Sequence, residues 1–456
     1  MEDLAATHFD DIILGTDNTS SILAAALAIS GHKVLHLDSQ GYYGSIDGTL
    51  SFNEFQKFLI SPETPPFLNK QIHISPGPDE ECNQFPRRFN FDLQAKMIYS
   101  VGDVVDYLLA CGIAQYIEFK SVKSGMLWTQ DGFRQVPCNK SEIFQDEKLN
   151  VVEKRKLMKI VEYCTKLLEG EDFDPNQDFK ALLEEKGLPE NLQNILFYAI
   201  LLVDGDTRSI TLGEALGKIQ KYSSSLGIYK EGSTLLYPMY GAGDISQGFC
   251  RVSAVYEGTY VITEELSIFG LLKEDNKIKG IATTLGEFHG NRVLLNSTFA
   301  NVDESLVAVP QAGITRGVIL SRGVFHENDG PVLFSVPPHT FENEFPIYIL
   351  QLSSNSSTCP EGYSVLHLYT RLSNYDENLH SFQRLIEQFP IEIVFYATYL
   401  QQITENSGEA VHIPNPGLGF EVSDHFEAAK KLFREIRGDE PFLPSRPNPA
   451  GEEEDF

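Results

Sequence analysis

Residues 11–45 arrange their glycine and acidic residues in the order of a dinucleotide-binding β-α-β unit. An apolar run reaches Gly15, an alanine-rich helix is expected next, and a second strand ends at Asp38. In such a unit, glycines let the backbone approach a pyrophosphate at the helix N-terminus, and the acid binds a ribose. Here Asp17 and Ser20 occupy the second and third glycine positions. The chain therefore either binds a flavin or nicotinamide, or has kept the fold and lost the cofactor.

Asp17 disfavours a bound dinucleotide on electrostatic grounds. Its Cβ and its negative charge would lie where two phosphates bind, and the repulsion in a partly desolvated site is on the order of a few kcal/mol. The helix dipole stabilises a bound phosphate by only about 1 kcal/mol. Asp17 is instead suited to cap the helix. We therefore expect a degenerate loop of Gly15, Asp17 and Ser20, without a cofactor.

Motifs of familiar catalytic sites are missing from the sequence. It contains no GxSxG, no HExxH and no P-loop, and its 11 histidines show no metal-ligand spacing. We therefore predict neither a catalytic residue nor a metal site. A flavin-dependent oxidoreductase remains an alternative because of the β-α-β unit.

A second candidate site is the glycine- and tyrosine-rich stretch over residues 236–260. Its aromatic side chains accompany Asp244, Gln247 and Arg251, and aromatic residues with arginine are typical of hot spots in protein interfaces. A glycine-rich turn that leads into a core strand explains the same composition, so both interpretations stay open here. The aromatic residues are Tyr237, Tyr240, Phe249, Tyr256 and Tyr260.

The composition is that of a globular protein of two or three domains, with 456 residues, 42% of them hydrophobic and 22% charged. A net charge of −28 argues against nucleic acid or anionic lipid as a partner; it allows a basic protein partner, and solubility alone explains it as well. No apolar run reaches the roughly 18 residues of a membrane span, and the acidic start lacks the core of a secretory signal. The six cysteines are scattered without a CxxC pair. We expect a cytosolic protein.

Local patterns predict individual elements. We expect an amphipathic helix over residues 94–111 and a β-hairpin over residues 116–138 with an Asp-Gly turn. Asn150 and Glu153 have the spacing of a capping box at the start of a helix. Further helices are expected over residues 191–203, 212–224 and 423–436, and strands over residues 233–240, 254–262 and beyond.

The pattern between residues 140 and 231 is helical, with β-rich segments on both sides. We therefore predict a large α/β domain of residues 1–139 and 232–440, interrupted by a helical domain of residues 140–231. The acidic, proline-rich residues 441–456 are typical of a disordered tail.

Five longer segments are more specific than these patterns: HKVLHLDSQGYYGS, RRFNFDLQAKMIYSVGDVVDYLL, QYIEFKSV, VPCNKSEIFQDEKLNVVEKRKLMK and LYPMYGAGDISQGFCRVSAVYEGTYVI. They resemble the Rab escort protein and Rab GDP dissociation inhibitor family, and the likeness runs with gaps from about residue 9 to PFLPSRPNP. The resemblance implies a large domain related to the FAD monooxygenases, with mixed sheets but no catalytic flavin, and a smaller all-helical domain inserted in it.

The resemblance also implies a Rab-binding platform on the large domain. An acid, an amide and an arginine can contact the polar switch regions of a GDP-loaded GTPase, and a tyrosine offers a flat amphipathic anchor. Matched by position, the platform consists of Tyr43, Asp244, Gln247, Arg251 and Val261.

Four positions depart from the pattern of the family. The family usually has glycine where Asp17 and Ser45 stand, glutamate where Asp244 stands, and a longer apolar side chain where Val261 stands. Asp244 keeps the charge but shortens the reach, which leaves the affinity and breadth of Rab recognition open.

Two further sites are implied for the helical domain. Phe144 and Arg155 match the pair that docks the Rab geranylgeranyltransferase in the escort branch. Their spacing of 11 residues is about three turns of one helix, whereas the capping box at Asn150 predicts a break between them. A buried structural anchor is the alternative role for Phe144. The prenyl groups of the Rab tail are expected near Ile200, Leu201, Leu202 and Val203.

The resemblance therefore implies an accessory protein rather than an enzyme. A Rab escort protein binds GDP-bound, unprenylated Rab, presents it to the transferase heterodimer, keeps the geranylgeranylated product soluble and delivers it to membranes through transient contact. Three alternatives remain. They are a Rab GDP dissociation inhibitor that extracts and recycles prenylated Rab, a flavin-dependent oxidoreductase, and a scaffold without Rab affinity.

Overall fold

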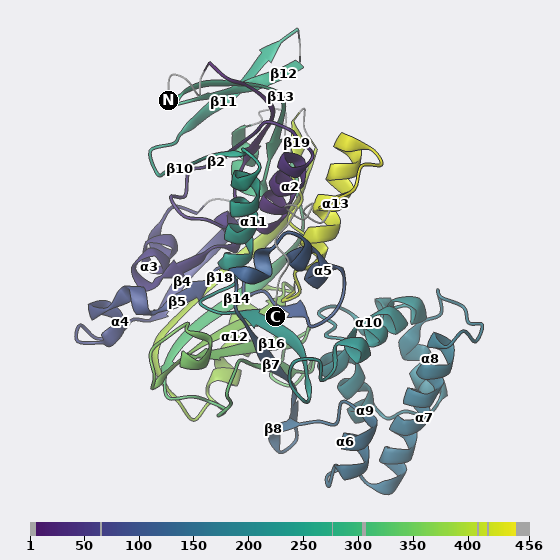
Figure 1. Ribbon diagram of the computed structural model, residues 1–456. Coiled ribbons are helices and arrows are strands. Elements are labelled where there is room, and N and C mark those ends of the chain that lie inside the picture. The colour runs from purple at the N-terminus through teal and green to yellow at the C-terminus, as the bar shows by residue number, and fades with distance from the viewer. Residues whose placement is uncertain are drawn as a thin grey trace, which may run out of the picture.

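The computed structural model describes residues 6–63, 66–275, 277–302, 307–407, 410–416 and 419–443. Two mixed sheets run through the body of the molecule, and a helical block projects from one side (Figure 1). This is the mixed α/β architecture that the sequence predicts. Among the described residues, none of the helices combines the length and the apolar character needed to cross a membrane. All six cysteines are described, and none forms a disulfide.

The first sheet has the strand order β10-β2-β1-β13-β12-β11, with β19 paired to β13. Its parallel centre confirms the predicted β-α-β unit, because β1 pairs with both β2 and β13 and α2 joins β1 to β2. Helix α2 is fully buried except at its end, since it packs between α11 and α13. The bounds are β1 (His8–Leu14), α2 (Asn18–Ile29), β2 (Val34–Asp38), α11 (Gly243–Val255), β10 (Thr259–Ile262), β11 (Ile268–Glu274), β12 (Lys277–Thr283), β13 (Gly286–Leu295), β19 (Val411–His412) and α13 (Ser423–Arg437).

The second sheet has the strand order β4-β18-β14-β17-β16-β15-β7-β9-β6. The predicted hairpin is confirmed as β7 and β8, which pair on either side of the turn before Gly132. The bounds are β4 (Phe67–Ile74), β6 (Ile98–Tyr99), β7 (Phe119–Thr129), β8 (Gly132–Gln135), β9 (Ser233–Pro238), β14 (Val307–Arg322), β15 (Val332–Val336), β16 (Ile347–Ser353), β17 (Tyr363–Arg371), α12 (Tyr375–Ile386) and β18 (Glu392–Ser407).

A short ladder of β3 (Thr49–Ser51) and β5 (Asn90–Asp92) lies beside this sheet, together with α3 (Phe52–Ile60) and α4 (Glu81–Gln84). Aromatic packing fixes the ladder, because the ring of Phe91 in β5 stacks on Phe55 of α3 with 5.1 Å between centroids. Both rings are fully buried. The ladder carries Asp92, which the functional site depends on.

The helical block contains α6 (Lys140–Gln145), α7 (Val151–Leu168), α8 (Phe179–Glu185), α9 (Glu190–Asn194), a π-helical turn (Ile195–Ile200) and α10 (Leu212–Ser225). It has its own buried apolar cluster and lies at the lower right of Figure 1. The predicted capping box is confirmed. The Asn150 side chain accepts the N–H groups of Val152 and Glu153, and the Glu153 carboxylate accepts the N–H of Asn150. A break between α6 and α7 follows from this cap.

The predicted helix over residues 94–111 is wrong in its first half. Only α5 (Asp103–Ala110) is helical, whereas Met97 bridges to Glu421 and Ile98 pairs with Leu236 in the second sheet. Gly102, with φ +120, separates the extended part from the helix. The apolar residues before Gly102 lie in extended backbone that pairs with other segments. Their helix-like spacing in the sequence therefore does not reflect a helix.

The segment predicted as a disordered tail begins with residues that pack. The ring of Phe442 lies 5.3 Å from the ring of Tyr107 and 5.6 Å from that of Phe433, and Leu443 is 2% exposed. These contacts join the chain after α13 to α5. Residues 444–456 lie outside the described residues.

We expect the packing of Phe442 and Leu443 to stabilise the large body. A variant that ends at Glu440 should have a free energy of unfolding about 2–4 kcal/mol below that of a variant that ends at Leu443, because it loses the buried Leu443 and the partly buried Phe442. Urea unfolding followed by circular dichroism measures the difference, and equal midpoints for the two truncations would contradict it.

Candidate functional site

Three of the residues that the sequence singles out lie on one face of helix α11. Asp244, Gln247 and Arg251 are spaced by three and four residues, which places them on neighbouring turns of the same face. Gln247 and Arg251 are exposed and Asp244 is half-buried. We call these three residues the α11 stripe. A glycine-rich turn that leads directly into a strand is therefore the wrong interpretation, because the helix runs to Val255 and the strand starts only at Thr259.

The buried carboxylate of Asp92 in β5 fixes the N-terminal end of α11. Its Oδ1 accepts the N–H of Ala242 at 2.9 Å and the hydroxyl of Thr49 at 2.6 Å, and its Oδ2 accepts the hydroxyl of Tyr237 at 2.6 Å. The Thr49 oxygen in turn accepts the N–H of Gly243 at 2.9 Å. Burial raises the pKa of Asp92 to about 6, although its three donors favour the ionised form. One carboxylate thus joins β3, β9 and the helix end.

Close packing explains the glycines at this end of the helix. Gly241 has φ +148, and a Cβ at this position would overlap the Thr49 side chain. A Cβ on Gly243 would lie 2.7 Å from the backbone nitrogen of Thr49. The two glycines therefore let α11 approach β3 closely enough for the hydrogen bonds to Asp92 and Thr49.

Tyr43 and Val261 flank the helix on the side of the first sheet. Tyr43 follows β2 and is 40% exposed, and its pKa is raised by partial burial and by the Cys250 thiol of α11, which places the phenol beside that helix. Val261 of β10 pairs with Leu37 of β2 and is half-buried against the apolar cluster of the first sheet. The structure thus places Tyr43 near Cys250 of α11, and Val261 lies on the strand that pairs with β2.

Tyr116 is a site residue that the sequence analysis missed. The Arg251 guanidinium carbon lies 3.7 Å from the centroid of the Tyr116 ring, which is 43% exposed. This cation–π contact orients the guanidinium toward solvent at the C-terminal part of the stripe. Ile113 supports the arrangement, because its side chain packs where α11 has Gly248. The two partners are 135 residues apart in the sequence, so no local pattern indicates them.

Asp244 is held in an environment that disfavours its charge. Burial and the nearby carboxylate of Asp92 raise its pKa to about 6. Within the described chain, no hydrogen bond or ion pair reaches its carboxylate to offset this. An acid kept ionised at neutral pH against such a cost is a candidate for binding a partner group.

The N-terminus of α2, where a dinucleotide unit binds phosphate, is closed by the chain itself. Asp17 caps α2, as the sequence predicts. Its carboxylate accepts the N–H of Ser20 at 3.2 Å, the hydroxyl of Ser20 at 2.6 Å and the side-chain amide of Asn296 at 2.6 Å. Complete burial raises the pKa of Asp17. A Cβ on Gly15 would overlap Asn296, so this amide fills the space beside the glycine.

Two more carboxylates accept hydrogen bonds at this end of α2. Asp38 accepts the N–H and the hydroxyl of Thr16 at 2.9 and 2.7 Å, and Asp47 accepts the N–H of Asn18 at 2.9 Å. Burial raises the pKa of both carboxyl groups, that of Asp38 to about 6. A pyrophosphate here would face three carboxylates and find the N–H groups of Thr16, Asn18 and Ser20 already bonded. These residues do not fit a dinucleotide. Nor do the described parts of the chain gather three His, Cys, Asp or Glu side chains that could hold a metal ion.

A second surface lies at the junction of α6 and α7. Phe144 is 67% exposed, so its alternative role as a buried anchor is wrong, and Arg155 is exposed on α7. The Lys154 amine donates to the Phe144 carbonyl at 2.8 Å, which holds the two helices together near both residues. Val151 and Val152, 64% and 60% exposed, add apolar surface. The junction thus offers an unburied aromatic ring within reach of cationic side chains.

The residues expected near the prenyl groups lie where the helical block meets the second sheet. Leu201 and Val203 are buried, and Ile200 and Leu202 are partly buried against the core of the large body. Leu201 and Leu202 line a cavity of about 240 Å³. The segment is tied to the sheet by the Tyr348 hydroxyl, which donates to the Val203 carbonyl at 2.7 Å.

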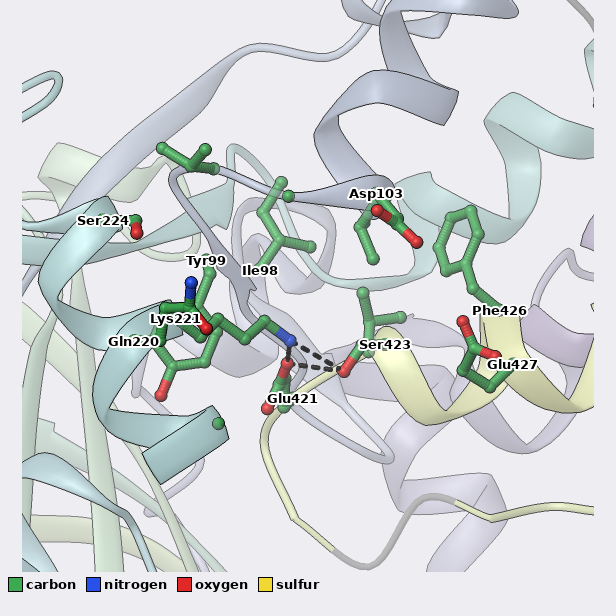
Figure 2. Close-up of a pocket in the computed structure, with 15 residues that line it drawn as sticks. Ile98, Tyr99, Asp103, Gln220, Lys221, Ser224, Glu421, Ser423, Phe426 and Glu427 are labelled. Carbon is green, nitrogen blue, oxygen red and sulfur yellow. Dashed lines mark hydrogen bonds and ion pairs between the residues drawn. The ribbon is translucent and has the colours of Figure 1, made fainter. Parts of the chain in front are cut away.

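A larger cavity of about 560 Å³ adjoins this one and shares Tyr99 and Glu421 with it (Figure 2). It lies between α10, the segment that leads into α5, and the start of α13. Lys221 of α10 spans it by pairing with Glu421 and donating to the Ser423 hydroxyl at 3.2 Å, as Figure 2 shows. Its lining is mixed, because apolar side chains such as Ile98 and Phe426 stand beside the charged Lys221.

The comparison with known families decides what kind of protein carries these surfaces. The model of a family described as GDP dissociation inhibitor matches residues 5–440. The chain belongs to the GDP dissociation inhibitor family. The family resemblance predicted from the sequence is therefore confirmed.

Relatives in this family cover nearly the whole chain. Rab escort protein 1 of Arabidopsis thaliana is 28% identical over 98% of this chain and 96% of its own length. The Rab proteins geranylgeranyltransferase component A of Drosophila melanogaster is 27% identical over 97% of this chain and 91% of its own. The Rab GDP-dissociation inhibitor of Saccharomyces cerevisiae is 26% identical, with 94% of each chain covered.

Solved structures share the fold. The RAB GDI of Plasmodium falciparum superposes with a TM-score of 0.78 at 18% identity, over 95% of this chain and 99% of its own. An oxidoreductase from Methanosarcina mazei superposes with a TM-score of 0.53 at 12% identity, over 88% and 89%. The predicted mixed α/β fold class is confirmed, since the fold is shared with a RAB GDI and with an oxidoreductase.

We expect Asp244→Asn to stabilise the protein in a pH-dependent way. The pKa of Asp244 is about 6 in the folded state against an ordinary value of 3.8. The folded state therefore binds more protons between these values, and its stability falls as the pH rises through this window. At pH 8 the variant should be about 1 kcal/mol more stable, since solvent screens a partly exposed group, and the gain should vanish below about pH 4.

Urea unfolding at pH 4 and pH 8 measures this effect. Asp172→Asn, at an exposed acid after α7, serves as the control and should change neither value. A gain for Asp244→Asn that is the same at both pH values would contradict the explanation.

Proposed function

We propose that this protein is a Rab escort protein. It binds newly made, GDP-bound Rab, presents its C-terminal cysteines to Rab geranylgeranyltransferase, keeps the prenylated product in solution and delivers it to membranes. The observation that carries the proposal is the exposed α11 stripe beside Tyr43, held rigidly by Asp92, in a chain of this family. Relatives named Rab escort protein and Rab proteins geranylgeranyltransferase component A support it.

The α11 stripe and its surroundings suit the polar switch regions of a GTPase. The Asp244 carboxylate accepts hydrogen bonds, the Gln247 amide both donates and accepts, and Arg251 presents a guanidinium already oriented by Tyr116. Tyr43 adds a flat anchor with one polar end. Binding a basic group of the GTPase would also relieve the cost of the buried charge on Asp244.

We place the transferase at the junction of α6 and α7. Phe144 offers an exposed aromatic anchor of the kind that dominates protein interfaces, and Arg155 offers a cation for an acidic partner group. A protein that holds both Rab and transferase raises the local concentration of a flexible tail that the transferase recognises poorly alone. This docking site distinguishes an escort protein from an inhibitor that only extracts and recycles Rab.

The helical block of residues 140–231 would shelter the geranylgeranyl groups as a domain inserted between residues 1–139 and 232–440. A prenyl chain gains about 0.8 kcal/mol for each buried CH₂ group, which offsets its loss from the membrane. Leu201 and Leu202 line a cavity, but Leu201 and Val203 are themselves buried, so the segment has to move to admit a lipid.

We further propose that the protein is an accessory subunit without catalytic activity and that it works in the cytosol with transient membrane contact. The carboxylates at the N-terminus of α2 support this view, since they occupy the donors that a flavin nucleotide requires in the related oxidoreductase fold. A Rab GDP dissociation inhibitor is the second candidate, favoured by the match to the yeast inhibitor over 94% of both chains.

Geranylgeranyl transfer to a GDP-loaded Rab, measured with transferase and lipid donor, tests this proposal. The wild-type protein should support transfer. Phe144→Ala should lower the rate at least 10-fold at unchanged affinity for Rab, since it removes only the transferase anchor. Phe173→Ala, at a ring that is 39% exposed, is the matched control and should leave the rate unchanged.

The alternatives give different results in the same assay. A protein that supports no transfer but extracts prenylated Rab from membranes is an inhibitor. A Phe144→Ala variant with the wild-type rate would show that the transferase docks elsewhere.

A further inference from the structure

The turn that enters α11 holds a tyrosine where the backbone favours glycine. Tyr240 has φ +71, in the left-handed region that bulky residues rarely adopt. Its N–H is fixed to the carbonyl of Ser356 at 2.9 Å, and the next residue, Gly241, is pressed against Thr49. The packing of the turn therefore imposes this conformation, and a glycine at position 240 would adopt it without strain.

The Tyr240 side chain makes no contact within the described protein that would offset this backbone strain. It is 57% exposed, and the described residues provide no ring contact, cation or hydrogen bond to its side chain. Tyr237, three residues earlier, shows the contrast, because it is fully buried and its hydroxyl donates to Asp92. Strained backbone conformations cluster at functional sites, although not every one of them marks such a site.

The position of Tyr240 points to the partner. It lies two residues before the N-cap of α11, Ala242, at the end of the helix that carries Asp244. The stripe itself is polar, whereas interface hot spots combine such contacts with a tyrosine or tryptophan that fills a desolvated pocket. An exposed ring at this end complements the polar contacts of Gln247 and Arg251.

We propose that Tyr240 is a further contact residue for the GTPase that the α11 stripe binds. Its ring fills an apolar depression on the GTPase, next to the polar groups that meet Asp244, and its hydroxyl reaches a polar group at the rim. The inference rests on the proposed function, because it assigns the residue to the same partner.

Tyr240→Gly tests this inference because stability and affinity should change in opposite directions. The variant should melt about 1–2 °C higher, since glycine relieves the strain. Its dissociation constant for an unprenylated, GDP-loaded Rab should rise at least 10-fold. A lower melting temperature, or wild-type affinity, would overturn the inference.

Glu257→Gly is the matched control. Glu257 has φ +68, is exposed, and lies just after the other end of α11. The same relief of strain should raise its melting temperature and leave the dissociation constant within twofold of wild type. A comparable loss of affinity in this variant would show that backbone flexibility near α11, and not the ring of Tyr240, determines binding.

Arg251→Ala separates the inference from the function on which it rests. If wild-type protein binds no GDP-loaded Rab, the proposed function fails. If the wild type binds and Arg251→Ala weakens binding while Tyr240→Gly does not, only the assignment of Tyr240 fails.

Discussion

The hydrogen bonds of the buried Asp92 carboxylate hold the proposed binding surface in place. They join β3 through Thr49, β9 through Tyr237, and the start of α11 through Ala242, which lies 150 residues further along the chain. Because α11 is anchored at this end, its stripe is presented on a fixed backbone rather than on a loop. Burial raises the pKa of Asp244, the first residue of the stripe, and the same Asp92 carboxylate adds to this shift.

The N-terminal end of α2, where a dinucleotide unit binds phosphate, is part of the core in this protein. Asp17, Asp38 and Asp47 take the donors around the N-terminus of α2, and α2 then serves as a buried support for α11 and α13. A helix end that binds phosphate in an oxidoreductase here closes on its own side chains. The β-α-β unit is thus closed at its phosphate-binding end, and exposed polar side chains lie on α11 instead.

Local sequence patterns correctly predicted the features that neighbouring residues determine, namely helix caps and a hairpin. The cap of Asp17, the capping box at Asn150 and the hairpin β7–β8 each follow from residues a few positions apart. Contacts between residues far apart in the sequence, such as that between Tyr116 and Arg251, could not be predicted from local patterns. The apolar residues before Gly102 are spaced as in a helix, although strand pairing is what buries them. The glycine-rich stretch, which indicated a turn, forms the tightly packed start of α11. The platform residues came from the family resemblance.

Hydrogen exchange of the full chain, with and without an unprenylated GDP-loaded Rab, tests the central claim most directly. The account predicts slower exchange in α11, in residues 39–44 and in the turn over residues 239–242, because these backbone segments carry the binding surface. Exchange in α12, on the second sheet, should stay unchanged and serves as the internal reference. Binding of Rab with unchanged exchange in α11, and protection confined to other elements, would contradict the account.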